Sequence, residues 1–100
     1  TTVVKDRVTV IIPTYKRPKN LKNALESVVN QDYPDIEVIV ISDNGTESEF
    51  NIETRQIVES FQNMNPNCNV IFIEHKINRN GSAARNTGIL HSTGEYICFL

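Results

Sequence analysis

The chain of 100 residues has room for one compact domain or for part of a larger one, and its 39% apolar and 22% charged residues are typical of a soluble globular protein and exclude a disordered one. Ten Lys and Arg residues against twelve Asp and Glu residues give a net charge of -2. Because these charges are interleaved along the chain, they do not indicate a nucleic-acid partner.

The first predicted strand is Val8–Ile12, a short β-branched run that Pro13 ends. From Pro18 to about Gln31 the pattern becomes helical, and Pro18 suits the first turn of a helix. The apolar residues that recur at helical spacing are Leu21, Ala24, Leu25, Val28 and Val29.

The second predicted strand, Ile36–Ile41, is almost continuously apolar, which is typical of a sheet covered on both faces. It is followed by Ser42–Thr46, in which the pair Asn44-Gly45 favours a tight turn with positive φ. We therefore expect Asp43 to be held at the carboxyl end of this strand.

The rest of the chain predicts two helices that alternate with two strands. In chain order, these are a helix that starts between Ser48 and Glu53 and is ended by Asn65-Pro66-Asn67, a strand at Asn69–Glu74, a helix that Ser82 caps and that runs to about His91, and a strand at Glu95–Leu100.

This βαβαβαβ alternation predicts an α/β fold with a mostly parallel sheet, right-handed crossovers and helices on both faces. Such an arrangement is a Rossmann-like nucleotide-binding half-fold. In an open parallel sheet, the ligand crevice lies outside the carboxyl ends of the strands. The segments that should line it are Pro13–Arg17, Ser42–Thr46 and His75–Arg85, together with whatever follows Leu100.

The first two of these segments contain groups that suit a nucleotide diphosphate. Pro13, Thr14 and Tyr15 can form a rigid pocket wall, or simply a turn from strand to helix. Arg17 can reach a phosphate or remain a solvated surface cation. Asp43 can accept hydrogen bonds from a base imide or a ribose hydroxyl, or merely cap its own turn.

The third segment combines a flexible turn with the start of a helix. Asn80-Gly81 lets the backbone approach a ligand, and the free amides of a helix start favour an anion. Arg85 lies one helical turn inside, where it is either a ligand contact or a surface cation. Ala83, Ala84 and Gly88 suggest close packing against the sheet.

Four stretches, in order along the chain, resemble the successive motifs of family 2 glycosyltransferases. They are Val8–Arg17 (VTVIIPTYKR); Leu25–Val28 with Gln31 and Tyr33-Pro34; Glu37–Thr46 (EVIVISDNGT); and Asn80–Ile89 (NGSAARNTGI) followed by Gly94–Ile97. Each stretch is weak alone, but the four together cover essentially the whole chain. The resemblance implies a GT-A fold, with residues 1–100 as its N-terminal nucleotide-binding part, truncated before the Asp-x-Asp motif.

The resemblance also implies roles for particular residues. In that family the acid at the position of Asp43 contacts the nucleotide base, and a second acid often stands at the position of Ser42. The Ala-Arg-Asn segment lines the donor site, where Arg85 would hold the diphosphate or organise the metal-site acids. The expected donor-binding set is Pro13, Thr14, Tyr15, Arg17, Asp43, Asn80, Gly81, Ala84 and Arg85.

The activity implied is that of an enzyme of polysaccharide biosynthesis, which transfers a sugar with inversion from a nucleotide diphosphate, expected to be UDP, to a hydroxyl of a carbohydrate or lipid-linked acceptor. A divalent metal, Mg²⁺ or Mn²⁺, is expected to stabilise the departing diphosphate. Its ligands and the catalytic base are expected outside this chain, so we assign no catalytic residue and no metal ligand here.

Two alternatives remain at this stage. A nucleotidyltransferase is disfavoured because Pro13–Arg17 contains no glycine. A non-catalytic regulatory nucleotide-binding module is disfavoured because it would be complete with five strands, whereas four are visible.

The residues outside these motifs carry further expectations. Cys68 and Cys98 are predicted to be buried free thiols, which suits a reducing cytoplasm. No apolar run is long enough to cross a bilayer, so any attachment to the inner face of the membrane would come from parts not present here. The sequence does not indicate an oligomeric state. Polar loop, helix-end, exposed or capping positions are expected for His75, His91, Glu26, Glu37, Glu74 and Glu95.

Overall fold

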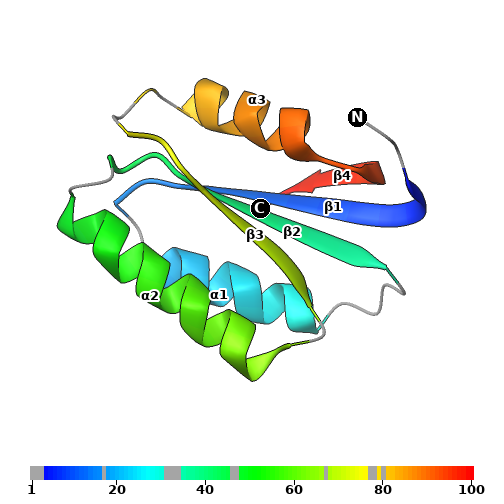
Figure 1. The fold of residues 1–100 in the computed structure, drawn as a ribbon, viewed down its shortest axis with the longest axis horizontal. Helices are drawn as coiled ribbons and strands as arrows, with labels where there is room; N and C mark the ends of the chain where they lie inside the picture. Colours follow the sequence, from blue (N-terminus) through cyan, green and yellow to red (C-terminus); the bar gives the residue numbers. More distant parts are fainter. Residues whose placement is uncertain are drawn as a thin grey trace.

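A computed structural model of the chain describes residues 4–16, 18–30, 35–45, 48–66, 68–76, 79 and 81–100. Within these residues, four strands alternate with three helices, as the sequence predicts (Figure 1). The elements are β1 (Val4–Thr14), α1 (Pro18–Val29), β2 (Ile36–Ser42), α2 (Glu49–Met64), β3 (Asn69–Glu74), α3 (Gly81–His91) and β4 (Gly94–Phe99).

The four strands form one parallel sheet in the order β3-β2-β1-β4. The chain builds this sheet outward from β1 to β3, and then returns to place β4 on the other side of β1. This reversal of direction between β1 and β4 is the topological switch point, next to which open α/β sheets bind their ligands.

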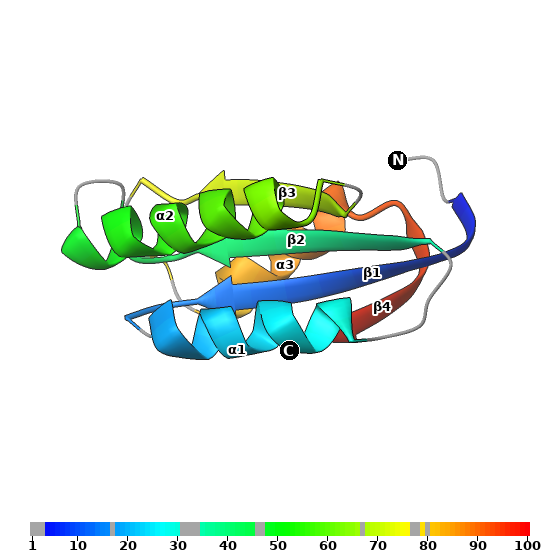
Figure 2. The ribbon, with the colours of Figure 1, turned by 90° about the horizontal axis from the view of Figure 1, so that it is seen from below.

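Helices cover both faces of the sheet, and the alternation of side chains along each strand decides what each helix contacts. On one face, Val8, Val10 and Ile12 of β1 form a buried cluster with apolar residues of α1 and α2. On the other, Ile11 packs with Ile39 and Ile41 of β2 and with α3. Figures 1 and 2 show α1 and α2 side by side below the sheet and α3 alone above it.

The prediction that Pro13 ends the first strand is wrong, because β1 continues through Pro13 to Thr14. The Ile11 carbonyl accepts a hydrogen bond from Leu100, on the β4 side, and the Thr14 carbonyl accepts one from Asp43, on the β2 side. Successive residues of a strand face opposite neighbours, so Pro13 faces the β4 side. Its missing N–H therefore leaves the pairing of β1 with β2 intact as far as Thr14.

The starts of α1, at Pro18, and of α2 agree with the sequence, whereas the start of α3 differs. Ser48 caps α2, and its hydroxyl accepts a hydrogen bond from the Phe50 backbone N–H, so this helix starts inside the predicted window. The prediction that Ser82 caps α3 is wrong. Because α3 already begins at Gly81, Ser82 lies in its first turn.

Glu37 is not the exposed or capping charge that the sequence predicts, because it is only 2% exposed. Its Oε2 accepts hydrogen bonds from the Thr9 hydroxyl (2.8 Å), from the Thr93 backbone N–H (3.0 Å) and from the Thr93 hydroxyl (3.0 Å). Thr9 also accepts a hydrogen bond from the backbone N–H of Gly94 (2.8 Å). We name Thr9, Glu37, Thr93 and Gly94 the buried clasp; it ties β1, β2 and the start of β4 together.

The clasp extends to the surface through Arg7. The Arg7 guanidinium donates to the Thr93 hydroxyl (2.9 Å) and pairs with Asp35 (3.1 Å). The pair is partly exposed, so it adds little stability by itself. All of these residues lie at or near the amino ends of the strands, away from the end where a ligand is expected.

β4 is an edge strand whose apolar side chains are largely exposed. Tyr96, Ile97, Phe99 and Leu100 are 43–58% exposed. Cys98 lies on the same strand and was predicted to be buried, but it is exposed, because β4 has a neighbouring strand on one side only. Cys68 is partly buried, and this burial raises the pKa of its thiol. Both cysteines are free.

None of the helices that the structure describes has the length and apolar character needed to cross a membrane.

Candidate functional site

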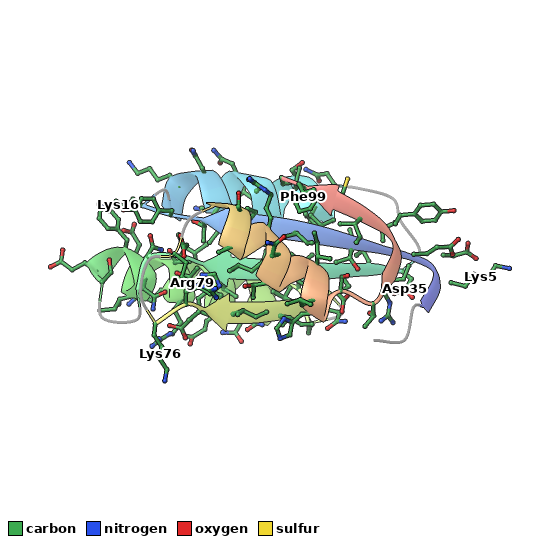
Figure 3. The ribbon with its side chains drawn as sticks, turned by 90° about the horizontal axis from the view of Figure 1, so that it is seen from above. Lys5, Lys16, Asp35, Lys76, Arg79 and Phe99 are labelled. Carbon is green, nitrogen blue, oxygen red and sulfur yellow. The ribbon has the colours of Figure 1, made fainter. Side chains whose placement is uncertain are left out.

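The segments that follow β1, β2 and β3 meet at one end of the sheet, where α2 and α3 also begin (Figure 1). Backbone hydrogen bonds continue past the strand ends: Asp43 N–H donates to the Thr14 carbonyl and His75 N–H donates to the Ser42 carbonyl, both at 2.9 Å. In Figure 3, Lys16 and Arg79 mark this end, whereas Asp35 lies at the opposite end. We call it the crevice end.

The predicted site residues of the first crevice segment lie in different environments, some exposed and some buried. Tyr15 is 45% exposed, and the Lys16 ammonium lies 5.1 Å from the centre of its ring, so an aromatic face and a cation stand together at the crevice end. Thr14 is instead buried and shares its register with Ser42 on the face that α1 and α2 cover. Pro13 is on the α3 face. Arg17 lies outside the described residues.

Thr14 has a buried hydroxyl that makes no hydrogen bond to any described residue. A buried polar group without a partner costs about 1–3 kcal/mol. We expect Thr14→Val, which keeps the shape and removes the hydroxyl, to raise the free energy of unfolding by about 1 kcal/mol in urea denaturation. A loss of stability would show that the hydroxyl has a partner, such as a bound water molecule.

The second crevice segment bends at Asn44, and Asp43 comes directly after β2, as predicted. Gly45 has φ 87°, the left-handed conformation expected from the Asn-Gly pair. Asn44 joins this segment to the first one, because its Oδ1 accepts a hydrogen bond from the Lys16 backbone N–H (2.6 Å). Lys16 itself has φ 55°, so this bond supports a strained residue.

Ser42 faces away from Asp43, toward α2. Its hydroxyl donates to the Asn51 side chain, and Asn51 in turn donates to Glu74. Burial alone would raise the pKa of the Glu74 carboxyl, but the hydrogen bonds from Asn51 and Arg55 and the charge of Arg55 outweigh burial and lower it. Ser42 therefore belongs to a polar network with Asn51 and Glu74, which lies on the α2 side of this segment.

The third crevice segment holds the Asp43 carboxylate in place. Asp43 is 3% exposed, and its Oδ1 accepts a hydrogen bond from the Arg79 backbone N–H (2.9 Å) and lies 2.8 Å from His75 Nδ1. The expectation that His75 is an ordinary polar loop residue is wrong, because it is 7% exposed and its Nε2 also lies 2.9 Å from the Thr87 hydroxyl on α3. His91 is exposed at the end of α3, as expected.

The predicted residues of α3 have different surroundings. Ala84 is 0% exposed and packs with Ile11, Ile39 and Ile41, so it is a packing residue of the core and not part of a binding surface. Arg85 is exposed. Gly81 begins the helix, and Asn80 lies outside the described residues. The structure thus brings Tyr15, Asp43 and the start of α3 to the crevice end.

His75 was not identified from the sequence as a partner of Asp43. The pairing of β2 with β3 would have indicated this contact. Ser42 and Glu74 are partners in the β2–β3 ladder, so the next residues, Asp43 and His75, leave the sheet side by side. A carboxylate and an imidazole at equivalent positions after neighbouring parallel strands are expected to meet.

Among the described residues, no group of three or more His, Cys, Asp and Glu side chains is placed to hold a metal ion. The acidic groups near the crevice end are occupied by protein contacts: Asp43 with His75 and Arg79, and Glu74 with Asn51 and Arg55. These described residues do not fit a metal centre.

Comparison with known sequences identifies the family of the chain. The family model described as "Glycosyl transferase family 2" matches residues 9–100. The chain is 34% identical over 98 residues to glycosyltransferase GlyA of Streptococcus pneumoniae, covering 98% of this chain and 13% of that protein. It is 29% identical to the GalNAc(5)-diNAcBac-PP-undecaprenol beta-1,3-glucosyltransferase of Campylobacter jejuni, covering 94% of this chain and 28% of that protein.

Two solved structures resemble the fold closely. The mannosyltransferase PcManGT of Pyrobaculum calidifontis, in complex with GDP-Man and Mn²⁺, has a TM-score of 0.80 and 30% identity, with 94% of this chain and 26% of that chain covered. TarS 1-349 of S. aureus, in complex with UDP-GlcNAc, has a TM-score of 0.77 and 31% identity, with the same coverage. The chain thus spans about a quarter of each of these structures.

Proposed function

Because the chain belongs to glycosyl transferase family 2, we propose that it forms the donor-nucleotide-binding part of a longer cytoplasmic enzyme that transfers a sugar from a nucleotide diphosphate to an acceptor hydroxyl. The observation that carries this proposal is the position of Asp43, fixed at the carboxyl end of β2 beside the segments that follow β1 and β3. That edge of a parallel sheet is where open α/β folds bind nucleotides.

Asp43 recognises the base in this proposal. An ionised carboxylate only accepts hydrogen bonds, so in this proposal a base presents an N–H group to Asp43, which His75 and Arg79 also contact. Tyr15, which is exposed at the same end, provides an aromatic face for the base.

The diphosphate lies near the start of α3. The backbone N–H groups of the first turn and the exposed Arg85 supply positive charge there. Arg17 and Asn80 belong to the same proposed set. UDP is the proposed nucleotide, since TarS was solved with UDP and with UDP-GlcNAc, whereas PcManGT was solved with GDP-Man.

The remaining chemistry belongs to other parts of the enzyme. We place the catalytic base, the ligands of a divalent metal and the site for a carbohydrate or lipid-linked acceptor in segments outside residues 1–100. The Mn²⁺ in the PcManGT complex supports a metal-dependent reaction. Inversion of the anomeric centre is also part of the proposal.

Asp43→Asn tests the proposed role of Asp43 with little disturbance of the fold. Asparagine keeps the size of the side chain and an oxygen that can accept from His75 and Arg79, but it removes the charge and adds an N–H donor, so it recognises a base N–H less well. We expect the Kd of the longer enzyme for UDP, measured by calorimetry, to rise about tenfold or more. The melting temperature should change little.

Asp35→Asn is the matched control, because Asp35 lies at the opposite end of the sheet and pairs with Arg7. Its UDP affinity should equal that of the unmodified enzyme. Equal UDP affinity for the Asp43 and Asp35 variants would contradict the role of Asp43. Tighter binding of GDP than of UDP would contradict the choice of nucleotide.

A further inference from the structure

One imidazole connects all three structural units around the proposed base-binding residue. His75 belongs to the segment after β3, its Nδ1 lies 2.8 Å from Asp43 Oδ1 after β2, and its Nε2 lies 2.9 Å from the Thr87 hydroxyl on α3. His75 is 7% exposed and Asp43 is 3% exposed, so the imidazole and the carboxylate are screened from water, and Thr87 is half-buried. Its backbone N–H is also fixed, by the Ser42 carbonyl.

We call the link from Asp43 through His75 to Thr87 the brace. Both of its hydrogen bonds can form whether the imidazole is neutral or cationic. A carboxylate only accepts hydrogen bonds, so Nδ1 must carry a proton toward Asp43. In the neutral imidazole, Nε2 then accepts the Thr87 hydroxyl proton. In the cationic imidazole, Nε2 donates to Thr87, whose hydroxyl donates instead to the Ala83 carbonyl 2.9 Å away.

The two hydrogen bonds of the brace affect different parts of the proposed site. The Nδ1 end, together with the Arg79 backbone N–H, holds the Asp43 carboxylate and thereby helps to set the direction in which it can accept from a base. The Nε2 end attaches that carboxylate to α3, the helix that carries Arg85. A buried group that is hydrogen-bonded at both ends loses its rotational freedom before a ligand arrives, which lowers the entropic cost of binding.

We propose that His75 is a positioning residue for the donor nucleotide. Through Nδ1 it orients Asp43 toward the base, and through Nε2 and Thr87 it keeps this carboxylate at a fixed position relative to α3. This inference rests on the proposed function, because it assumes that Asp43 contacts the base. It assigns His75 no contact with the sugar or with the bond that is broken.

Two substitutions separate the two ends of the brace. The amide nitrogen of His75→Asn lies the same number of bonds from Cα as Nδ1, so it can still donate to Asp43 but cannot reach Thr87. The amide nitrogen of His75→Gln corresponds in the same way to Nε2, so it can reach Thr87 but withdraws the donor from Asp43. Each variant removes the ring and one of its two contacts, so we expect similar decreases in melting temperature.

The affinity of the longer enzyme for UDP, measured by calorimetry, distinguishes a positioning role of His75 from a purely structural role. We expect His75→Gln to raise the Kd about tenfold, because a hydrogen bond to a charged group is lost, and His75→Asn to raise it no more than about threefold. In steady-state kinetics the change should appear in the donor KM more than in kcat. His91→Gln, at an exposed histidine at the end of α3, should bind UDP normally.

A third variant avoids substitution of the buried imidazole. Thr87→Val leaves the bond between His75 and Asp43 intact and releases the imidazole from α3, and we expect the Kd for UDP to rise about threefold. Unchanged affinity in this variant would overturn the link to α3, and it does so even if neither His75 variant folds.

The outcomes separate this inference from the function on which it rests. If the enzyme binds neither UDP nor GDP, or if Asp43→Asn binds UDP normally, the proposed function of the site fails. If Asp43→Asn weakens binding but the two His75 variants bind UDP equally, only the positioning role of His75 is refuted. A larger loss in His75→Gln than in His75→Asn supports it.

Discussion

Gly94→Ala is expected to destabilise the protein by more than about 3 kcal/mol or to prevent folding. A Cβ at Gly94 would lie 2.3 Å from the Thr9 Oγ1, 2.7 Å from the Thr9 backbone N and 3.0 Å from the Arg7 carbonyl O. Two of these three atoms are backbone atoms of β1, which pairs with β2 and β4 and cannot move aside. The free energy of unfolding, from urea denaturation followed by far-UV circular dichroism, measures the effect.

Gly88→Ala provides the comparison for this prediction. A Cβ at Gly88 would lie 2.5 Å from Ile11 Cγ2 and 3.0 Å from Ile41 Cδ1, which are side-chain atoms that can partly rearrange. We expect a cost of about 1–3 kcal/mol, the usual range for overpacking a core. A Gly94 variant that is as stable as the Gly88 variant would show that backbone contact at the β1–β4 junction is not the limiting factor.

Glu37→Ala is expected to lower the free energy of unfolding by about 3 kcal/mol, because three donated hydrogen bonds lose their common buried acceptor. Glu37→Gln keeps an oxygen at the same place and should cost only about 1 kcal/mol. Denaturation in urea, with the same optical signal, compares the two variants directly.

Glu26→Ala serves as the exposed counterpart, since Glu26 lies on the solvent-facing side of α1. Its stability should remain within about 0.5 kcal/mol of the unmodified protein. If Glu37→Ala proves no more destabilising than Glu26→Ala, the buried clasp does not stabilise the sheet.

The periodicity of the sequence was sufficient to predict the order of the elements, and turn chemistry was sufficient to place Asp43. Ile36–Ile41 is apolar at successive positions because both faces of β2 are covered, and Asn44-Gly45 can form the tight turn that ends it. These are local properties, set by residues that are close together in the chain.

Burial of polar groups was not predictable in the same way, because it depends on segments that are distant in the sequence. Glu37 is buried by Thr93, 56 residues away, and His75 meets Asp43 across 32 residues. Cys98 has the neighbours of a buried strand residue in the sequence, yet it lies on the edge strand and is exposed. Such contacts follow from strand order and register, which hydrophobic patterns alone do not specify.

The buried clasp also has a consequence for the order in which the chain folds. Thr9 and Glu37 are 28 residues apart, whereas Thr9 and Gly94 are 85 residues apart. Synthesis proceeds from the N-terminus, and closing the longer loop costs more entropy, so β1 and β2 can associate long before β4 reaches them. During that interval the carboxylate of Glu37 is hydrated where Thr93 later binds it, and the arrival of β4 replaces this water with the hydrogen bonds from Thr93.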